Sequence, residues 1–451
     1  MVSVSKLNYR QVWEAHKGEF SRLVQIPSMY DAESAGPETP YGIPVYRALG
    51  YMKELCRQEG FQITEYDGAA FAASWGTGER IDIVSHLDVV GVTDGWEEDP
   101  FSGSIHDGYV HGRGTQDMKS GAYLTFLALK LIKDSGIVPK KEIRLVYGTD
   151  EERTMDDMRL YVTKAGLPAF SFTPDGTFPM VNGEKGALMW IMEGDYTGFV
   201  RSLSGGIQPN VIPPEAVAAV DFHDAGLAAR TAQSLGIDAA FEVLPEALQI
   251  RVKGKAAHAS RPESGRNAVT DLFRLLAALS GEEMLRRIAS CFGDAHGQGA
   301  GMGYDISPMG KLSLSPGIVE ITNGRIRFWI DCRYPYGVGS DTLTGILSAH
   351  FPEYDVALSY DAPPTFTPED DPYILALKTA YRAATGRACT ASISGGVSYA
   401  KVFGHCVTFG ALAEGSENLT HQKNEKISES DCIAALEIYH NAIKNLMEVA
   451  K

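Results

Sequence analysis

Apolar residues recur at helical spacing in three stretches near the start of the chain, and short apolar runs separate them. In the first stretch Val45, Leu49 and Met52 fall on one helical face. The pattern predicts helices over 45–59, 120–135 and 156–166, with glycine stop signals after each of the first two. Strands are predicted over 81–88, 143–152 and 169–176, where apolar runs end in polar or acidic residues.

Strands that alternate with helices predict an α/β fold, with a mostly parallel sheet covered by helices on both faces. Open sheets of this kind bind ligands at the carboxyl ends of their strands. Polar side chains stand at those ends here, and we expect them to converge along one sheet edge: His86, Asp88, Glu151, Glu152 and Asp175.

The middle of the chain has a different pattern, with strands over 248–254 and 324–335 around a helix over 267–280. Two loops rich in glycine and proline, 204–214 and 361–368, are expected to act as hinges. A helix resumes over 371–386. The sequence therefore predicts a domain made of 1–186 and 362–451, interrupted by an inserted α+β domain over 187–361.

Composition narrows the class of protein. The 451 residues are 44% apolar, ample for a large core, and carry a formal charge of −16, which disfavours nucleic acid and anionic membranes. We find no secretory signal in the first twenty residues and no apolar run long enough to span a membrane. The six cysteines lack CxxC spacing. We therefore expect a cytoplasmic protein with reduced thiols and neither nucleic-acid nor membrane partners.

Three motifs carry candidate chemistry, and each has a simpler interpretation. His86 and Asp88 stand two apart in a strand, so Asp88 is placed to orient the imidazole of a metal ligand; alternatively, His86 is an ordinary surface or core histidine. Asp117 stands in a glycine-rich turn before a long helix, where it either binds a ligand or caps the helix. Glu151 and Glu152 form either a metal ligand and a proton carrier or an acidic helix start.

Two further candidates, Asp175 and His421, taken alone indicate only a turn after proline and a surface loop. The ordered set is much more specific than its members. Over 85–121 the chain reads SHLDVV, then DPFSGSIHDGYVHGRGTQDMKSG. This series resembles the aminoacylase/carboxypeptidase/carnosinase family of two-metal peptidases, and within it the bacterial carnosine-cleaving type of dipeptidase, which has an enlarged lid.

The resemblance implies a phosphorylase/hydrolase-like fold and a role for each motif. Asp117 would bridge two divalent metal ions, with His86 and Asp175 completing one site and Glu152 and His421 the other. The ligand types suit zinc, and also manganese or cobalt. Glu151 would be the general base, and the peptide bond after Asp117 is expected to be cis.

In the inserted domain the resemblance extends to GKAAHASRPESGRNA, residues 254–268. It implies that His258 stabilises the oxyanion, that Asn210 contacts the substrate and that Arg333 clamps its carboxylate. A loop containing Gly395, Gly396 and Ser398 would offer backbone N–H groups to the same carboxylate. Val397 and Lys401 stand where the family has glycine and arginine. Because valine resists positive φ, we expect this loop to differ in shape.

The expected activity is hydrolysis of the amide bond of a dipeptide or similar small peptide with a free carboxylate, by a metal-bridged hydroxide with Glu151 as base. One alternative is an N-acyl amino acid deacylase or desuccinylase. A second, of another class, is a metal-dependent binding protein without catalysis. Structural calcium fits poorly, because calcium takes oxygen ligands rather than histidine. By the same resemblance, an insert of this size implies a lid that acts within one chain, and hence a monomer.

Overall fold

The computed structural model describes residues 7–450, which divide into two compact units. The first unit holds the described residues up to Gly183, together with Phe366–Ser392 and the chain from Ser398 onward. The inserted unit holds Glu184–Thr365 and the short piece Ile393–Val397. The division predicted from the sequence, 1–186 and 362–451 around 187–361, does not include the short piece Ile393–Val397 as part of the inserted unit. Residues 1–6, part of the segment in which we expected no secretory signal, lie outside the described residues.

The first unit is built on a nine-stranded sheet whose centre is parallel. Its four central strands are β6 (Glu142–Gly148), β3 (Arg80–His86), β7 (Phe170–Thr173) and β21 (Cys406–Thr408), in that order. The flanking strands are β1 (Gln62–Tyr66), β2 (Ala70–Trp75), β8 (Met180–Glu184), β19 (Thr365–Phe366) and β20 (Ala391–Ser394). The predicted mostly parallel sheet is thus confirmed at its centre, while β1, β2 and β8 pair antiparallel.

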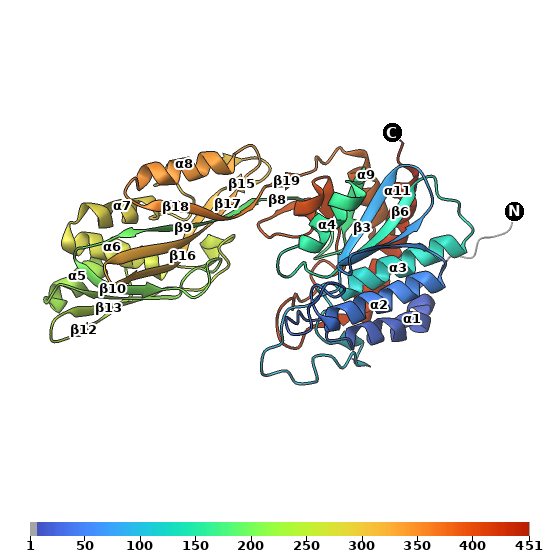
Figure 1. Ribbon diagram of the computed structural model, residues 1–451, viewed down its shortest axis with the longest axis horizontal. Coiled ribbons are helices and arrows are strands. Elements are labelled where there is room, and N and C mark those ends of the chain that lie inside the picture. The colour runs from blue at the N-terminus through green and yellow to red at the C-terminus, as the bar shows by residue number, and fades with distance from the viewer. Residues whose placement is uncertain (1–6, 451) are drawn as a thin grey trace. The chain divides into compact units, whose positions relative to one another are not determined.

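Helices cover both faces of this sheet, as Figure 1 shows for the first unit. Along β3, Ile81 and Ile83 join the core that α3 (Lys119–Asp134) and α11 (Glu429–Glu448) share. Asp82 points to the other face, where it accepts a hydrogen bond of 2.7 Å from Tyr161 of α4 (Asp156–Ala165). The remaining helices of this unit are α1 (Tyr9–Val24), α2 (Ile43–Gln58), α9 (Pro372–Thr385) and α10 (Ala400–Phe403).

We expect acid to weaken the packing of α1 on α11 through His440. The ring lies 3.0 Å from the Tyr9 hydroxyl, and burial together with Lys444 lowers the pKa of His440 from 6.5 to about 4. A depressed histidine pKa contributes stability above the unfolded value, and that stability is lost as the pH falls through the folded value. Between about pH 7 and pH 4, wild-type Tm should therefore fall more steeply than that of His440→Gln. Circular dichroism melts check this; parallel curves would contradict it.

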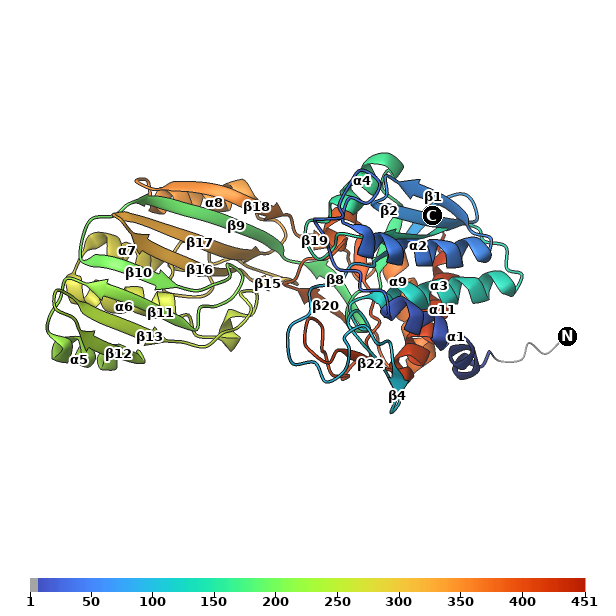
Figure 2. The same cartoon turned by 60° about the horizontal axis from the view of Figure 1, so that its bottom comes forward.

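The inserted unit is an eight-stranded sheet with antiparallel pairing. The strand order is β12 (Ala239–Val243), β13 (Leu248–Lys253), β11 (Glu215–Val220), β10 (Val200–Gly205), β16 (Ser313–Thr322), β17 (Arg325–Tyr334), β9 (Gly186–Asp195) and β18 (Asp355–Ala362). Figure 2 shows helices behind one face of the sheet: α5 (Ala225–Leu235), α6 (Ala268–Ser280), α7 (Glu283–Cys291) and α8 (Ser340–His350).

Small elements complete the fold: a three-stranded sheet of β4 (Ile105–His106), β5 (Tyr109–His111) and β22 (Lys426–Ser428), the pair β14 (Asp305–Ile306) and β15 (Gly310–Lys311), and the 3-10 turn Pro262–Ser264. Among the described residues, no helix combines the length and apolar character needed to cross a membrane.

The two predicted hinge loops have different outcomes. Segment 361–368 contains the point where the chain returns from the inserted unit to the first unit. Segment 204–214 lies wholly inside the inserted unit, where it joins β10 to β11, so the prediction of a hinge between domains is wrong there. Its glycines and prolines end one strand and shape the connection to the next.

Candidate functional site

The carboxyl ends of the central strands bring the predicted ligands together. β3 ends at His86, whose Nε2 lies 3.0 Å from Asp117 Oδ1 and 3.9 Å from Oδ2 of Asp175, which follows β7. His86 also groups with Asp175 and Glu151, the latter in the segment after β6, with ligand atoms all within 4.8 Å of one another. This edge of the sheet thus carries a group of side chains that could hold a metal ion.

Asp117 faces a second imidazole with its other oxygen. Asp117 Oδ2 lies 3.0 Å from His421 Nε2, and the same nitrogen lies 3.1 Å from Glu152 Oε1. A single carboxylate therefore stands between two histidines that are far apart in the sequence. Glu152 lies near both, since its ligand atom also lies within 4.8 Å of those of His86 and Asp117. This is the arrangement expected of a bridging ligand shared by two metal sites.

Close packing at the start of α3 holds Asp117 near Asp175. A Cβ on Gly121 would lie 2.3 Å from the carbonyl oxygen of Pro174, so only glycine lets the helix approach the turn that carries Asp175. The Asp117–Met118 peptide bond, directly before α3, is cis as expected.

Asp88 holds the imidazole of His86 mainly through its backbone. His86 Nδ1 lies 3.0 Å from the Asp88 carbonyl oxygen and 3.5 Å from its carboxylate Oδ1. The other carboxylate oxygen accepts a hydrogen bond of 3.0 Å from the backbone N–H of Glu152. Asp88 therefore fixes the ring of one candidate ligand and the backbone of another, and leaves Nε2 of His86 to face Asp117.

The charges of the cluster fit a pair of divalent cations. Burial raises the pKa of Glu151 well above its usual range, and the neighbouring carboxylates raise it further. Hydrogen bonds to Asp117 and Glu152 raise the pKa of His421 to about 10. Buried carboxylates this close repel one another unless a positive charge stands among them. Imidazoles and carboxylates without a thiolate are the donors that zinc, manganese and cobalt accept.

The backbone at His421 is strained in the way often seen at functional sites. Its φ is +62°, and that of Asn424 is +59°, in the left-handed region that residues other than glycine seldom adopt. The Asn424 side chain is used as well, because its Oδ1 accepts a hydrogen bond of 2.9 Å from the backbone N–H of Glu97. The loop that presents His421 is therefore held in a specific conformation.

Two residues that we did not predict support the acidic loop after β6. Asp157 Oδ2 accepts hydrogen bonds from the backbone N–H groups of Thr149 (2.5 Å) and Asp150 (3.0 Å), and from the Tyr399 hydroxyl. The Tyr399 ring stands edge-on to the His86 ring, with centroids 6.1 Å apart. The sequence alone gives no signal for this role, because an acidic residue in the first turn of a helix is common.

The inserted unit brings together its own predicted residues. Val211 forms a β-bridge with His258, and the Ala259 N–H donates to the Asn210 carbonyl at 2.9 Å, so these two segments run side by side. The Ser260 N–H donates to His258 Nδ1 at 3.1 Å, which leaves the proton of a neutral ring on Nε2. Desolvation and the nearby Arg333 lower the pKa of His258, which favours that neutral form.

Arg333 is largely engaged within the inserted unit. Its Nε and Nη2 donate to the two carboxylate oxygens of Asp331 at 3.0 and 2.7 Å, and Nη1 donates to the Gly395 carbonyl at 3.1 Å. Of its five N–H groups, two remain without a hydrogen bond to described residues, one on each terminal nitrogen. A bound carboxylate would meet that pair rather than the side of the guanidinium that Asp331 occupies.

The loop after β20 accommodates Val397. Among the described residues, positive φ is found at neither of the two glycines of this loop nor at Val397. The valine therefore adds no left-handed strain. A Cβ on Gly395 would lie 2.5 Å from the Ser260 Cβ, so glycine is needed there for close packing. Ser398, the next predicted contact, accepts a hydrogen bond of 3.2 Å from the Ala400 N–H through its hydroxyl.

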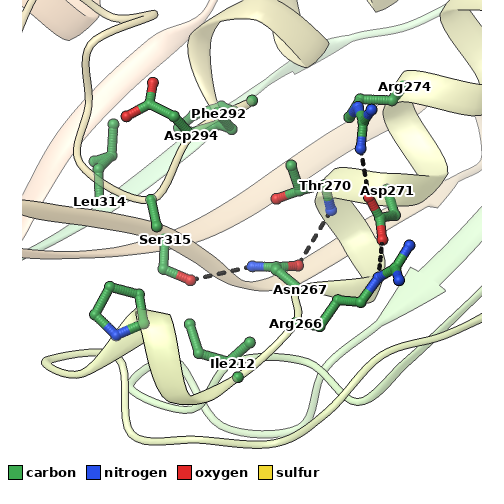
Figure 3. A pocket seen from close by; sticks show the side chains of 14 residues that line it. Ile212, Arg266, Asn267, Thr270, Asp271, Arg274, Phe292, Asp294, Leu314 and Ser315 are labelled. Carbon is green, nitrogen blue, oxygen red and sulfur yellow. Dashed lines mark hydrogen bonds and ion pairs between the residues drawn. The ribbon is translucent and has the colours of Figure 1, made fainter. Parts of the chain in front are cut away.

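In a pocket of the inserted unit, three of the four charged lining residues are paired with one another, and the fourth, Asp294, accepts hydrogen bonds from backbone N–H groups of its own loop (Figure 3). Arg266 and Arg274 both bind the carboxylate of Asp271, at 2.6 and 2.8 Å. The Asn267 side chain caps α6 and donates to the Ser315 hydroxyl at 3.1 Å. These groups stabilise the start of α6 and are not positioned as free ligand-binding groups.

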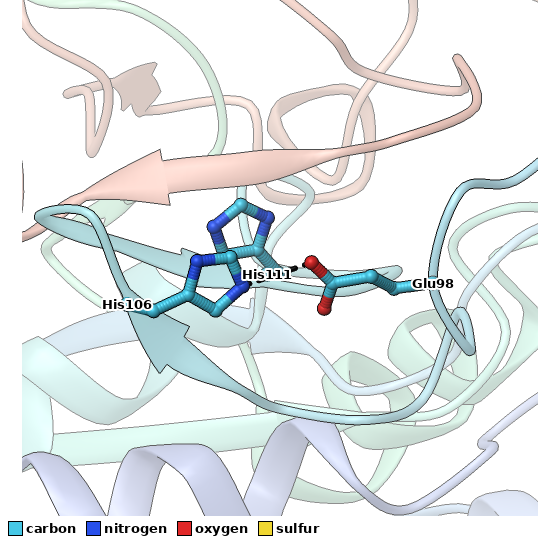
Figure 4. Close-up of side chains that lie close together, drawn as sticks. All are labelled: Glu98, His106 and His111. Atoms are coloured by element: carbon cyan, nitrogen blue, oxygen red, sulfur yellow. Dashed lines mark hydrogen bonds and ion pairs between the residues drawn. The ribbon is translucent and has the colours of Figure 1, made fainter.

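A second histidine cluster lies at the surface of the first unit, near β4 and β5 (Figure 4). His106 Nε2 lies 2.8 Å from Glu98 Oε1, and its Nδ1 lies 3.2 Å from Asp107 Oδ2. The rings of His106 and His111 stack face to face, with centroids 4.1 Å apart and planes 9° apart. Lone pairs lie in the plane of an imidazole, so stacked rings direct them side by side rather than at one ion. Hydrogen bonds to Asp107 and Glu98 raise the pKa of His106, while burial and the neighbouring His106 lower the pKa of His111.

Comparison with known proteins identifies the family of this chain. The sequence model of peptidase family M20/M25/M40 matches residues 83–445. The Beta-Ala-Xaa dipeptidase of Lactobacillus delbrueckii subsp. lactis is 29% identical over 464 aligned positions, which cover 98% of each chain.

Solved structures share the fold. Human carnosine dipeptidase 1 aligns with a TM-score of 0.60 at 16% identity, covering 98% of both chains. The aminoacylhistidine dipeptidase of Vibrio alginolyticus aligns with a TM-score of 0.60 at 13% identity, covering 100% of this chain and 98% of that one. Because the family model spans most of the chain, this protein belongs to peptidase family M20/M25/M40, a family of metallopeptidases.

Proposed function

We propose that the protein is a metal-dependent dipeptidase that hydrolyses the amide bond of dipeptides with a free carboxylate. The observation that carries the proposal is Asp117, whose two oxygens each lie 3.0 Å from a different histidine, with Glu151 beside the same cluster. The full-length similarity to a Beta-Ala-Xaa dipeptidase supports a dipeptide as the substrate class.

Each side chain has a role in the proposed reaction. His86 and Asp175 would hold one ion, Glu152 and His421 would hold the other, and Asp117 would be a ligand to both. Two ions bound there would polarise the scissile carbonyl and acidify a water molecule. Glu151 takes a proton from the attacking water and delivers it to the leaving nitrogen. Asp88 keeps the His86 ring in position through the contacts described above. Zinc is the metal we propose, with manganese or cobalt as substitutes.

His258 is the proposed oxyanion donor, and we expect His258→Ala to lower kcat by about 10²–10³-fold. The N–H of the neutral ring suits this role, because it donates to a carbonyl oxygen that becomes negative in the transition state. Steady-state kinetics with a dipeptide measure the loss, and an unchanged metal content shows that the ions are still bound. His223→Ala, an exposed histidine of the same unit, is the control. A variant with wild-type kcat would contradict the assignment.

For substrate recognition we propose that the substrate carboxylate binds the two remaining N–H groups of Arg333 and the backbone N–H groups of Gly395 and Ser398. The Gly396 N–H donates to the Ser394 hydroxyl at 2.9 Å and would have to exchange that partner for the substrate. Asn210 contributes a further polar contact. Arginine offers the paired donors that match a carboxylate. A dipeptide whose C-terminal carboxylate is amidated should then be a much poorer substrate than the free acid.

The test of function is a substrate panel. Purified protein loaded with zinc, manganese or cobalt is assayed against β-alanyl and α-aminoacyl dipeptides and against N-acetyl and N-succinyl amino acids. Faster hydrolysis of dipeptides supports the proposal. Preferential hydrolysis of N-acyl amino acids would favour the deacylase alternative, and metal binding without any hydrolysis would favour the binding-protein alternative.

We also propose that the protein is a cytoplasmic monomer. The six free cysteines, five of them buried, support a reducing compartment. Light scattering of the active enzyme tests the oligomeric state, and a stable dimer with shared activity would contradict it.

A further inference from the structure

Glu425 is a buried carboxylate that the proposed chemistry does not use. It stands directly before β22, only 1% exposed. Its backbone carbonyl accepts a hydrogen bond of 2.9 Å from the Gly112 N–H, which extends the pairing of β22 with β5. The side chain is thereby directed into the turn from Gly112 to Asp117, which carries the central ligand of the cluster.

Both carboxylate oxygens of Glu425 are used by that turn. Oε2 accepts hydrogen bonds from Arg113 Nη1 at 2.6 Å and from the Gly114 N–H at 3.1 Å. Oε1 accepts from the Gln116 N–H at 2.7 Å and from the Asp117 N–H, more weakly, at 3.3 Å. One anion therefore binds the backbone of the turn at three points, including Asp117 itself.

The same contacts connect Asp117 to His421. His421 lies four residues before Glu425, in the loop that leads into β22. The Gln116 side chain closes the connection: its Nε2 donates to the carbonyls of Glu417 and Lys426 at 3.0 and 2.7 Å, and its Oε1 accepts from the Leu419 N–H at 2.7 Å. The turn that presents Asp117 is thus bound to the segment that presents His421 at residues on both sides of that histidine.

We propose that Glu425 is a positioning residue that sets the distance between Asp117 and His421, and so determines the geometry of the second metal site. The inference rests on the proposed function, since it assigns those two side chains to one ion. Only a carboxylate meets the requirement. Glutamine would place an amide NH₂, itself a donor, against one pair of the N–H donors and so lose those hydrogen bonds. Aspartate would keep the negative charge, but its side chain is one methylene shorter and would not reach the turn as closely.

The experiment compares Glu425→Gln and Glu425→Asp with the wild type and with a matched control. Glu282→Gln is that control, because Glu282 is also a bracing carboxylate: it accepts from the Phe199 N–H at 2.6 Å and the Tyr196 hydroxyl at 2.8 Å, both in the inserted unit. Each protein is stripped of metal and titrated with cobalt(II), and its visible absorption bands report the ligand geometry. Dipeptide kinetics and Tm are measured on the same samples.

Glu425→Gln should bind cobalt about 10–100-fold more weakly, with shifted absorption bands, and should lose kcat by a similar factor. KM should change by less than about threefold, because the substrate contacts remain. Glu425→Asp should fall between this variant and the wild type. Glu282→Gln should lose Tm but keep the wild-type cobalt spectrum.

Two results would overturn the inference. One is a Glu425 variant with lowered Tm but wild-type cobalt affinity and spectrum, which would make the residue a structural brace. The other is failure of both Glu425 variants to fold while Glu282→Gln folds, which would make the carboxylate a requirement of the fold rather than of the site. Failure of the proposed function is distinct: the wild type itself would then bind no cobalt or hydrolyse no dipeptide.

Discussion

Glu151→Ala should lose about 10²–10⁴-fold in kcat for a dipeptide while still binding about two metal ions per chain. The reason is that the two adjacent glutamates have different proposed roles: Glu152 is a metal ligand and Glu151 is the general base. Glu152 lies 3.1 Å from His421 in one donor set, whereas Glu151 lies with His86 and Asp175. Burial and the neighbouring carboxylates raise the pKa of Glu151, and two bound cations would favour the ionised form that a general base needs.

Steady-state kinetics and elemental analysis of the purified variant check both parts of this prediction. Asp156→Ala serves as the control, because Asp156 is an exposed carboxylate close by, ion-paired with Arg159 at 2.8 Å. Glu152→Ala should behave differently, losing metal together with activity. A Glu151→Ala protein that turns over at the wild-type rate would refute the assignment of the base.

Asp117→Ala should lose at least one ion and nearly all hydrolysis. Both histidines face this one carboxylate, so its removal takes a ligand from each site at once. The loss also removes stabilisation by metal. A ligand at 100 times its Kd stabilises a fold by about 2.7 kcal/mol, and we expect most of this zinc-dependent gain to be absent from the variant.

Thermal unfolding with and without added zinc measures that gain, and elemental analysis measures the bound metal. Asp107→Ala is the matched control, since Asp107 is an exposed aspartate that forms an ion pair with the surface residue His106. An Asp117→Ala protein that keeps two ions and the full zinc-induced rise in Tm would show that Asp117 is not the shared ligand.

Much of the framework follows from local pattern. The apolar periodicity of 45–59 and 120–135 predicts α2 and α3 to within two residues at each end. Polar residues that follow strands predict which side chains meet, because parallel strands end at one edge. Residues two apart on a strand share a face, so the pairing of Arg333 with Asp331 was also accessible from β17.

Other features depend on contacts that no local pattern encodes. The Tyr399 hydroxyl reaches an aspartate 242 positions away, and Arg113 reaches a carboxylate 312 positions away. Each residue taken alone resembles an ordinary tyrosine or arginine, and only the tertiary fold reveals its partner. The antiparallel flanks of the central sheet also escaped prediction, because strand direction is set by the path of the chain rather than by the strand's own residues.

The short piece Ile393–Val397 determines which segments must be exchanged if the inserted unit of this enzyme is replaced by that of a relative. It is distant in sequence from the rest of the inserted unit, yet it supplies the carbonyls of Ser394 and Gly395, which accept from the Lys185 N–H at 2.9 Å and from Arg333. A chimera that exchanges only 184–365 would combine the relative's counterpart of β17, the strand that carries Arg333, with this protein's own Ile393–Val397 loop. The two segments would then not have been selected to bind each other. Grafts that aim to transfer substrate preference must therefore move both segments together.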